Sequence, residues 1–149
     1  MSEQDDNAKV KDEEQLARFV YSPRNIDPVT EKLKDNFIFL RKQEKGISCI
    51  LLDRAGEDRT IAIGKSFIRG KDEKLYGWGF CKAGEIRGVS PKIDVILNNP
   101  ANNPYHAEIQ FTFDGEIVKG EVTHPEILDY FDRIQNLMSL KQLSDNSES

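Results

Sequence analysis

Cysteine is scarce in this chain, and no cysteine spacing suits a metal. Cys49 and Cys81 are the only two cysteines among 149 residues, and they form neither a CxxC pair nor any other zinc-ligand spacing. Isolated cysteines on predicted strands are more often buried apolar side chains than partners in a disulfide. The sequence therefore predicts no disulfide framework, no metal site and no cofactor.

Long apolar runs and an excess of positive charge are also missing. No apolar segment approaches the roughly 20 residues needed to cross a bilayer. The acidic start lacks the apolar core of a signal peptide. We therefore expect a cytoplasmic protein with no membrane partner. The formal net charge of −5 gives no support to a general nucleic-acid surface, so nucleic acid is a disfavoured partner.

The negative charge is concentrated at the two ends of the chain. Residues 1–14 hold six acidic residues against two lysines, and residues 141–149 hold two acidic residues against one lysine. Residues 15–140 are neutral on the same count. Charge-rich ends with few apolar residues are typical of disorder. The sequence predicts disordered tails at 1–14 and 141–149 around one domain at 15–140.

Alternating and β-branched segments predict a sheet. Strands are expected at 18–22, 47–52, 75–81, 93–97, 105–113 and 116–118. The segment 57–68 is an amphipathic helix candidate with a strand as the competing prediction. Thr123, Pro125 and Glu126 form a capping box and helix start. We expect an α+β fold, in which a C-terminal amphipathic helix packs on a mostly antiparallel sheet.

The two most aromatic strands predict a candidate binding surface. Residues 75–81 and 105–113 each have one aromatic side, and we expect these sides to form the core. Glycine inside a strand is unfavourable unless backbone or ligand approaches closely. The opposite sides would then share a shallow binding groove made by Gly77, Gly79, His106, Glu108 and Gln110.

Two arginines near the first strand are further binding candidates. Arg18 lies within the strand, and Arg24 follows it in a turn rich in Ser, Pro, Asn and Asp. A guanidinium beside the Ser22 hydroxyl suits a phosphate. A plain surface turn is the competing interpretation.

His106 and Glu108 are the candidate catalytic residues. Histidine titrates near neutral pH, so His106 suits a general base or a metal ligand. His124 could add a second imidazole, if the helix start folded back toward Glu108. A surface pair with His124 in the first helical turn explains the same residues, and we therefore predict no metal site.

The aromatic side of the first strand has an alternative interpretation. Tyr76, Trp78 and Phe80 are framed by lysines and arginine, as in stacking platforms for single-stranded nucleic acid. Core packing explains the same alternation. Whether this face is exposed decides between the two interpretations.

Three segments resemble a set of small uncharacterised bacterial proteins. They are Arg18–Ser22, Ile61–Gly64 and Pro104–Ile109. That set has an N-terminal RFxYS-like strand and a PxHAxI-like segment, and the likeness covers about residues 18–110. It implies a bacterial protein and gives weight to His106. The set has no established activity, so it implies no catalytic residue.

No complete catalytic constellation occurs in the chain, which leaves enzymatic activity undecided. We therefore predict a non-enzymatic binding or accessory module of the bacterial cytoplasm, whose groove face or acidic tail contacts a protein partner. The alternative is a small enzyme acting on a nucleotide or nucleic acid. In it His106 would serve as base or metal ligand, and Arg18 or Arg24 would hold phosphate.

Overall fold

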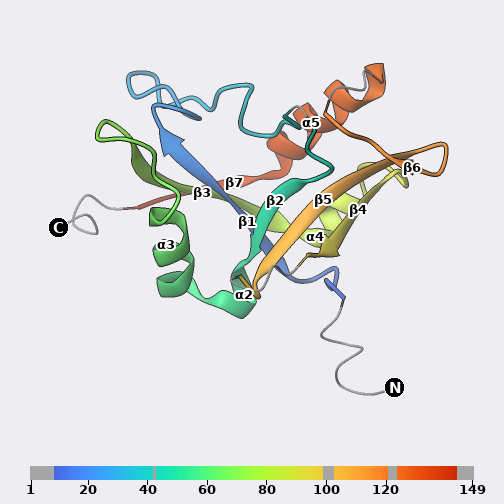
Figure 1. The fold of residues 1–149 in the computed structure, drawn as a ribbon, viewed down its shortest axis with the longest axis horizontal. Helices are drawn as coiled ribbons and strands as arrows, with labels where there is room; N and C mark the ends of the chain where they lie inside the picture. Colours follow the sequence, from blue (N-terminus) through green and yellow to red (C-terminus); the bar gives the residue numbers. More distant parts are fainter. Residues whose placement is uncertain (1–8, 42, 99–102, 121–123, 144–149) are drawn as a thin grey trace.

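The described residues of the protein form a seven-stranded sheet with four helices, shown in Figure 1. The computed structural model describes residues 9–41, 43–98, 103–120 and 124–143. The elements in order are β1 (Gln15–Ser22), β2 (Ile47–Leu51), α2 (Leu52–Ala55), α3 (Glu57–Lys65), β3 (Lys74–Lys82), α4 (Ala83–Arg87), β4 (Ile93–Leu97), β5 (His106–Phe113), β6 (Glu116–Ile117), α5 (Pro125–Leu137) and β7 (Ser139–Gln142).

The sheet has the strand order β4-β5-β2-β1-β3-β7, and β6 pairs with β5. Every pairing is antiparallel. The predicted α+β class with a mostly antiparallel sheet is confirmed. Among the described helices none is long and apolar enough to cross a membrane.

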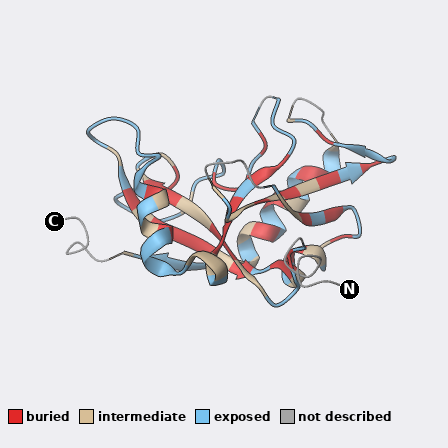
Figure 2. Cartoon of the chain, turned by 60° about the horizontal axis from the view of Figure 1, so that its bottom comes forward, coloured by how far each residue is buried: buried red, intermediate tan, exposed pale blue. Residues whose placement is uncertain are grey.

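One face of the sheet carries the main core. Ile47, Ile109 and Phe111 are at most 1% exposed on this face, and α5 covers them with a buried stripe that includes Phe131 and Ile134. The Phe131 ring meets Phe111 edge-on at 5.5 Å. Burying such side chains stabilises the fold by roughly 1.5–3 kcal/mol each. Figure 2 shows the buried stretches along the strands and on the inner sides of the helices.

Pro125 lies in the first turn of α5, as predicted. Thr123, the predicted N-cap, lies outside the described residues. The helix begins at Pro125, with His124 at the N-cap position and Glu126 in the first turn.

Helix α3 covers the opposite face of the sheet. The segment 57–68, for which the sequence allowed a helix or a strand, contains this helix. A Cβ on Gly64 would lie 2.7 Å from the Phe19 ring and 2.8 Å from Leu75, so only glycine allows this close packing. Tyr21 donates a 2.7 Å hydrogen bond to the Gly64 carbonyl. Trp78, which pairs in register with Phe19, is 2% exposed.

Strand β7 crosses the boundary between the predicted domain at 15–140 and the predicted tail at 141–149. Ser139–Gln142 pairs with β3 although all four residues are exposed. Backbone hydrogen bonds rather than apolar burial place this strand, which is why no alternation indicates it. Residues 144–149 lie outside the described part of the chain.

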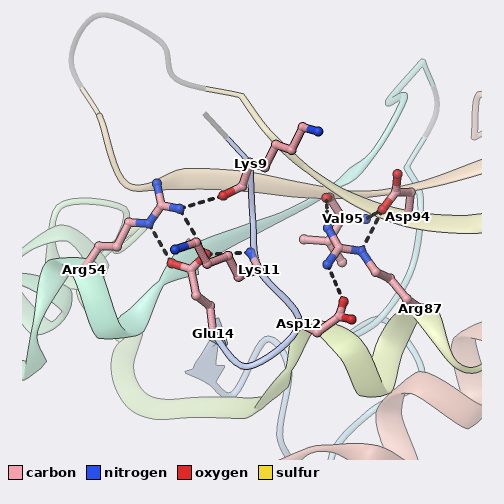
Figure 3. A network of polar contacts seen from close by, with 8 residues as sticks. All are labelled: Lys9, Lys11, Asp12, Glu14, Arg54, Arg87, Asp94 and Val95. Carbon is pink, nitrogen blue, oxygen red and sulfur yellow. Dashed lines mark hydrogen bonds and ion pairs between the residues drawn. The ribbon is translucent and has the colours of Figure 1, made fainter. Parts of the chain in front are cut away.

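Residues 9–14 are held against the domain, although the sequence predicts a disordered tail there (Figure 3). Arg54 donates to the Glu14 carboxylate at 2.6 Å and to the Lys9 carbonyl at 2.8 Å. Arg87 donates to Asp12 at 2.7 Å. Val10 is 4% exposed. Asp12 and Glu14 pair with arginines, which charge counting along the sequence could not indicate. Residues 1–8 lie outside the description.

Arg87 also closes the free edge of β4. It donates to Asp94 at 2.8 Å and to the Val95 carbonyl at 2.9 Å, and Asp94 accepts from the Val95 amide at 2.7 Å. The outward polar groups of Val95 are thus satisfied by side chains. Unpaired strand edges otherwise invite pairing with another chain.

Candidate functional site

A pocket opens where β1 and β2 separate. The two strands pair only at Leu16 with Leu51 and at Ala17 with Ile50. Beyond these residues they diverge, as Figure 1 shows. A pocket of about 270 Å³ lies between them. Its walls come from both strands, from Arg41 and Glu44, from the turn after α3 and from the start of β5.

Arg18 bridges the two strands at this opening. Its Nε donates to the Phe37 carbonyl and its Nη1 to the Ser48 carbonyl, both at 2.8 Å. The bond to Ser48 joins β1 to β2 where the backbone pairing between them has ended, and the bond to Phe37 ties β1 to the connection between the two strands. Burial lowers the pKa of the Arg18 guanidinium, but an arginine starts so high that it stays charged. The pocket therefore has a fixed positive charge in its wall.

Arg24 is held by a carboxylate and an aromatic ring. Its guanidinium donates through two nitrogens to Glu73, with Nε at 2.9 Å, and lies 4.5 Å above the Tyr21 ring. Glu73 also accepts from the Arg69 amide at 2.9 Å. The hydrogen bond from Arg24 lowers the pKa of the Glu73 carboxyl against an opposing effect of desolvation. The pair fixes Arg24 at the pocket wall.

Two more arginines lie at the pocket wall with exposed side chains. They are Arg41 and Arg69. The Arg41 amide donates to Glu44 at 2.6 Å, and Glu44 is the one acidic residue among the described residues that line the pocket. Four guanidinium groups thus surround a single small cavity in a chain whose net charge is −5. The local field favours an anion.

Aromatic side chains form the rest of the wall. Tyr21 is 5% exposed, and burial raises the pKa of its hydroxyl to about 12, so the hydroxyl remains a donor. Phe19 lies 6.2 Å from the Tyr21 ring, measured between centroids. Phe67 is 55% exposed beside the pocket. The cavity therefore joins a cationic side to an apolar one.

His106 reaches the same pocket from β5. Its Nδ1 lies 2.6 Å from the Asn98 carbonyl. Since a carbonyl only accepts, this contact places a proton on Nδ1 and leaves the lone pair on Nε2 when the ring is neutral. The neighbouring Asn103 accepts from the His106 amide through its carbonyl at 3.3 Å.

The pocket unites three of the predicted binding residues. They are Arg18, Arg24 and His106. Gly77 and Gly79 do not share a face with His106. Gly79 pairs with Arg18 on the main-core side, where a Cβ would meet Phe37 at 2.9 Å. The groove expected from the two aromatic strands is therefore not formed, because β2 and β1 separate β5 from β3 and the glycines face the other way.

The other two residues of that expected groove lie along β5, outside the pocket lining. Glu108 accepts a hydrogen bond from the Asn98 amide group. Gln110 pairs in register with Asp94 of β4. A binding role for these residues, as for the two glycines, stays a prediction.

The possible metal ligands do not converge. The His124 ring stacks on Phe113 at 4.2 Å, at the opposite end of β5 from His106 and Glu108. Within the described ranges, no group of three or more His, Cys, Asp or Glu side chains could hold a metal ion.

The aromatic face of β3 is largely packed. Trp78, the central ring of the alternative stacking platform, is 2% exposed and has no free face for a base. Tyr76 and Phe80 are half-buried, and Tyr76 packs against the main core. Core packing therefore accounts for the alternation in this strand.

Arg41, Phe67 and Arg69 are pocket residues that the sequence interpretation missed. Arg41 and Arg69 lie between the strands and the helix predicted from the sequence, and Phe67 lies near the end of the predicted segment 57–68. No local pattern marks them, because only the divergence of β1 and β2 brings these segments together.

Comparisons of the chain with protein-family models, with curated proteins and with solved structures found no match. The interpretation of the pocket therefore depends on its own geometry and charge.

Proposed function

We propose that this protein is a non-enzymatic binding module whose arginine pocket holds the phosphate of a small molecule. The observation that carries the proposal is the gathering of Arg18, Arg24, Arg41 and Arg69 around one cavity, which has a single acidic residue among its described lining residues. Guanidinium groups bind phosphate oxygens through paired, charge-assisted hydrogen bonds.

Preorganisation supports a binding site over an incidental cluster. Arg18 is fixed by two carbonyls and Arg24 by Glu73, so neither cation has to be ordered when a ligand arrives. Avoiding that ordering cost raises affinity. Arg41 and Arg69 would then close on the anion from the exposed side.

The setting of the proposal comes from the sequence. The resemblance and the two free, buried cysteines favour a bacterial cytoplasmic protein. A protein partner, predicted from the sequence, stays a prediction that no described contact addresses.

A titration tests the phosphate site. We expect inorganic pyrophosphate to bind the full chain, measured by isothermal titration calorimetry, with an affinity that falls as salt screens the arginines. The double variant Arg41→Gln/Arg69→Gln should bind at least tenfold more weakly. Arg133→Gln removes one positive charge from the exposed face of α5, where Arg133 lies 3.8 Å from Asp129, and serves as the control. Equal losses in the double variant and the control would contradict the proposal.

A second candidate, a small enzyme acting on a bound nucleotide, has one observation in its favour. The contact of Nδ1 with the Asn98 carbonyl gives neutral His106 the tautomer of a general base at Nε2. Phosphorus NMR of nucleoside phosphates incubated with the protein tests this candidate. Turnover that His106→Gln removes would support it, and unchanged substrate after long incubation would dispose of it.

A further inference from the structure

We infer that the ligand of the arginine pocket carries a planar base as well as its phosphate, and that it is a nucleoside monophosphate. This inference rests on the proposed function, since it assigns the phosphate to the arginines. It adds a second part of the ligand and a second part of the pocket.

Phe67 is the residue that points to a ring. It lies just beyond the end of α3, two positions before Arg69, and both residues line the pocket. The turn is held by hydrogen bonds from the Phe67 amide to Gly64 at 3.2 Å and from the Ile68 amide to Lys65 at 3.3 Å. An aromatic ring that is 55% exposed in a pocket that arginines also line suits a stacked base.

The deeper wall continues the apolar side. Phe19 is half-buried, and Ile50 is 3% exposed within the lining of the same cavity. Tyr21 separates this apolar side from Arg24, because the Arg24 guanidinium lies on its ring at 4.5 Å. A ligand with one flat apolar part and one anionic part would match both sides.

The size of the pocket limits the ligand. A volume of about 270 Å³ lies just below the range of roughly 300–1,000 Å³ typical of ligand pockets. A single nucleotide matches this size better than a dinucleotide or a nucleic-acid strand. Asn103 also lines the pocket, and its Oδ1 accepts from the Tyr105 amide at 3.2 Å. Its amide nitrogen provides donors for a base edge.

Affinity measurements with three compounds test the inference. We expect AMP to bind at least about tenfold more tightly than ribose 5-phosphate, because stacking adds to the phosphate contacts. Adenosine, which lacks the anion, should bind weakly. Phe67→Leu keeps an apolar side chain but removes the ring. It should lower the affinity for AMP to nearly that for ribose 5-phosphate and leave the affinity for ribose 5-phosphate unchanged. Leu128→Ala, at a 63% exposed position on α5, should change neither.

The outcomes separate this inference from the proposed function. Equal affinities for AMP and ribose 5-phosphate, with binding of both lost in Arg41→Gln/Arg69→Gln, would overturn the inference that the pocket binds a base. The proposed phosphate site would stand. Binding of neither compound would overturn both. Tighter binding of a single-stranded oligonucleotide than of AMP would overturn the mononucleotide as the ligand.

Discussion

Arg18 connects the fold and the site at the scale of one residue. In the middle of a strand it carries a charged side chain toward the core, where two carbonyls accept its hydrogen bonds. A cation there lets β1 and β2 part without leaving those carbonyls unsatisfied, and the space between the strands becomes the pocket. Sequence reasoning singled out Arg18 as a phosphate ligand but could not identify this bridging role.

Replacing Arg18 should therefore affect stability as well as binding. We expect Arg18→Met to lower the free energy of unfolding by about 1–3 kcal/mol, because the Phe37 and Ser48 carbonyls lose a charged donor. Urea denaturation followed by tryptophan fluorescence measures this, since Trp78 is buried. Arg133→Met should change stability by less than about 0.5 kcal/mol, as expected for an exposed helix pair. Equal effects of the two variants would contradict the bridging role.

Glu73 should make stability depend on acid pH. Its folded pKa lies below the ordinary value of 4.5, so its ion pair with Arg24 stabilises the protein fully above about pH 4.5. That stabilisation is lost as the pH falls through the folded pKa. We expect Glu73→Gln to cost about 1–2 kcal/mol at pH 7 and to flatten the loss of stability between pH 5 and 3. Thermal melts across this range test it, with exposed Glu116→Gln as the control. If Glu73→Gln lost stability between pH 5 and 3 as steeply as the unchanged protein, the Glu73–Arg24 ion pair would be excluded as the cause.

Strand β7 depends on a single glycine at the scale of elements. A Cβ on Gly77 would lie 1.8 Å from the Lys141 carbonyl oxygen, so no side chain fits while β7 pairs with β3. The sequence interpretation assigned this glycine to a ligand groove. Close approach of backbone, the other reason for glycine in a strand, is the one that the structure provides.

We expect Gly77→Ala to detach β7 from β3, because one of the two backbones must move. The free energy of unfolding should fall by about 2 kcal/mol or more. Hydrogen exchange of residues 139–142, together with urea denaturation, measures the change. Gly88→Ala is the matched control, since a Cβ there would meet nothing nearer than 3.4 Å. Protection of β7 that survives in Gly77→Ala would refute the steric argument.

Periodic elements were predictable, and elements placed by remote contacts were not. The alternation of Ala107, Ile109, Phe111 and Phe113 predicts β5 and its buried side, as the structure has it. The exposed strand β7 carries no such pattern. Residues 9–14 are held by arginines far along the chain. Their acidic composition, read locally, therefore indicates only a tail.

The pocket belongs to the whole molecule. Arg18, Arg24 and His106 were predicted individually, because their side chains suit binding chemistry wherever they lie. Their convergence, and the presence of Arg41, Phe67 and Arg69, follow from sheet order and strand divergence. Neither is encoded in any local spacing.

The two cysteines report on global unfolding. Cys49 and Cys81 are free and 2% and 4% exposed, and burial raises the pKa of both thiols to about 12. At pH 8 almost no thiolate is present in the folded state. We expect reaction with a disulfide reagent such as Ellman's reagent to be at least a hundredfold slower in the native protein than in 6 M urea. Rapid labelling of Cys49 in the native protein would contradict this expectation and show that the reagent reaches Cys49 through the pocket.

The segment 9–14 has a kinetic consequence. Its ion pairs join Glu14 to Arg54 and Asp12 to Arg87, which are 40 and 75 positions apart. Contacts that close such long stretches of chain usually form after the transition state of folding. The double variant Asp12→Ala/Glu14→Ala, which removes both carboxylates, should then increase the rate of unfolding. In stopped-flow experiments it should leave the refolding rate unchanged. Slower refolding would place the segment in the nucleus instead. On this account the acidic segment governs the lifetime of the folded molecule, whereas the sheet governs the speed of its formation.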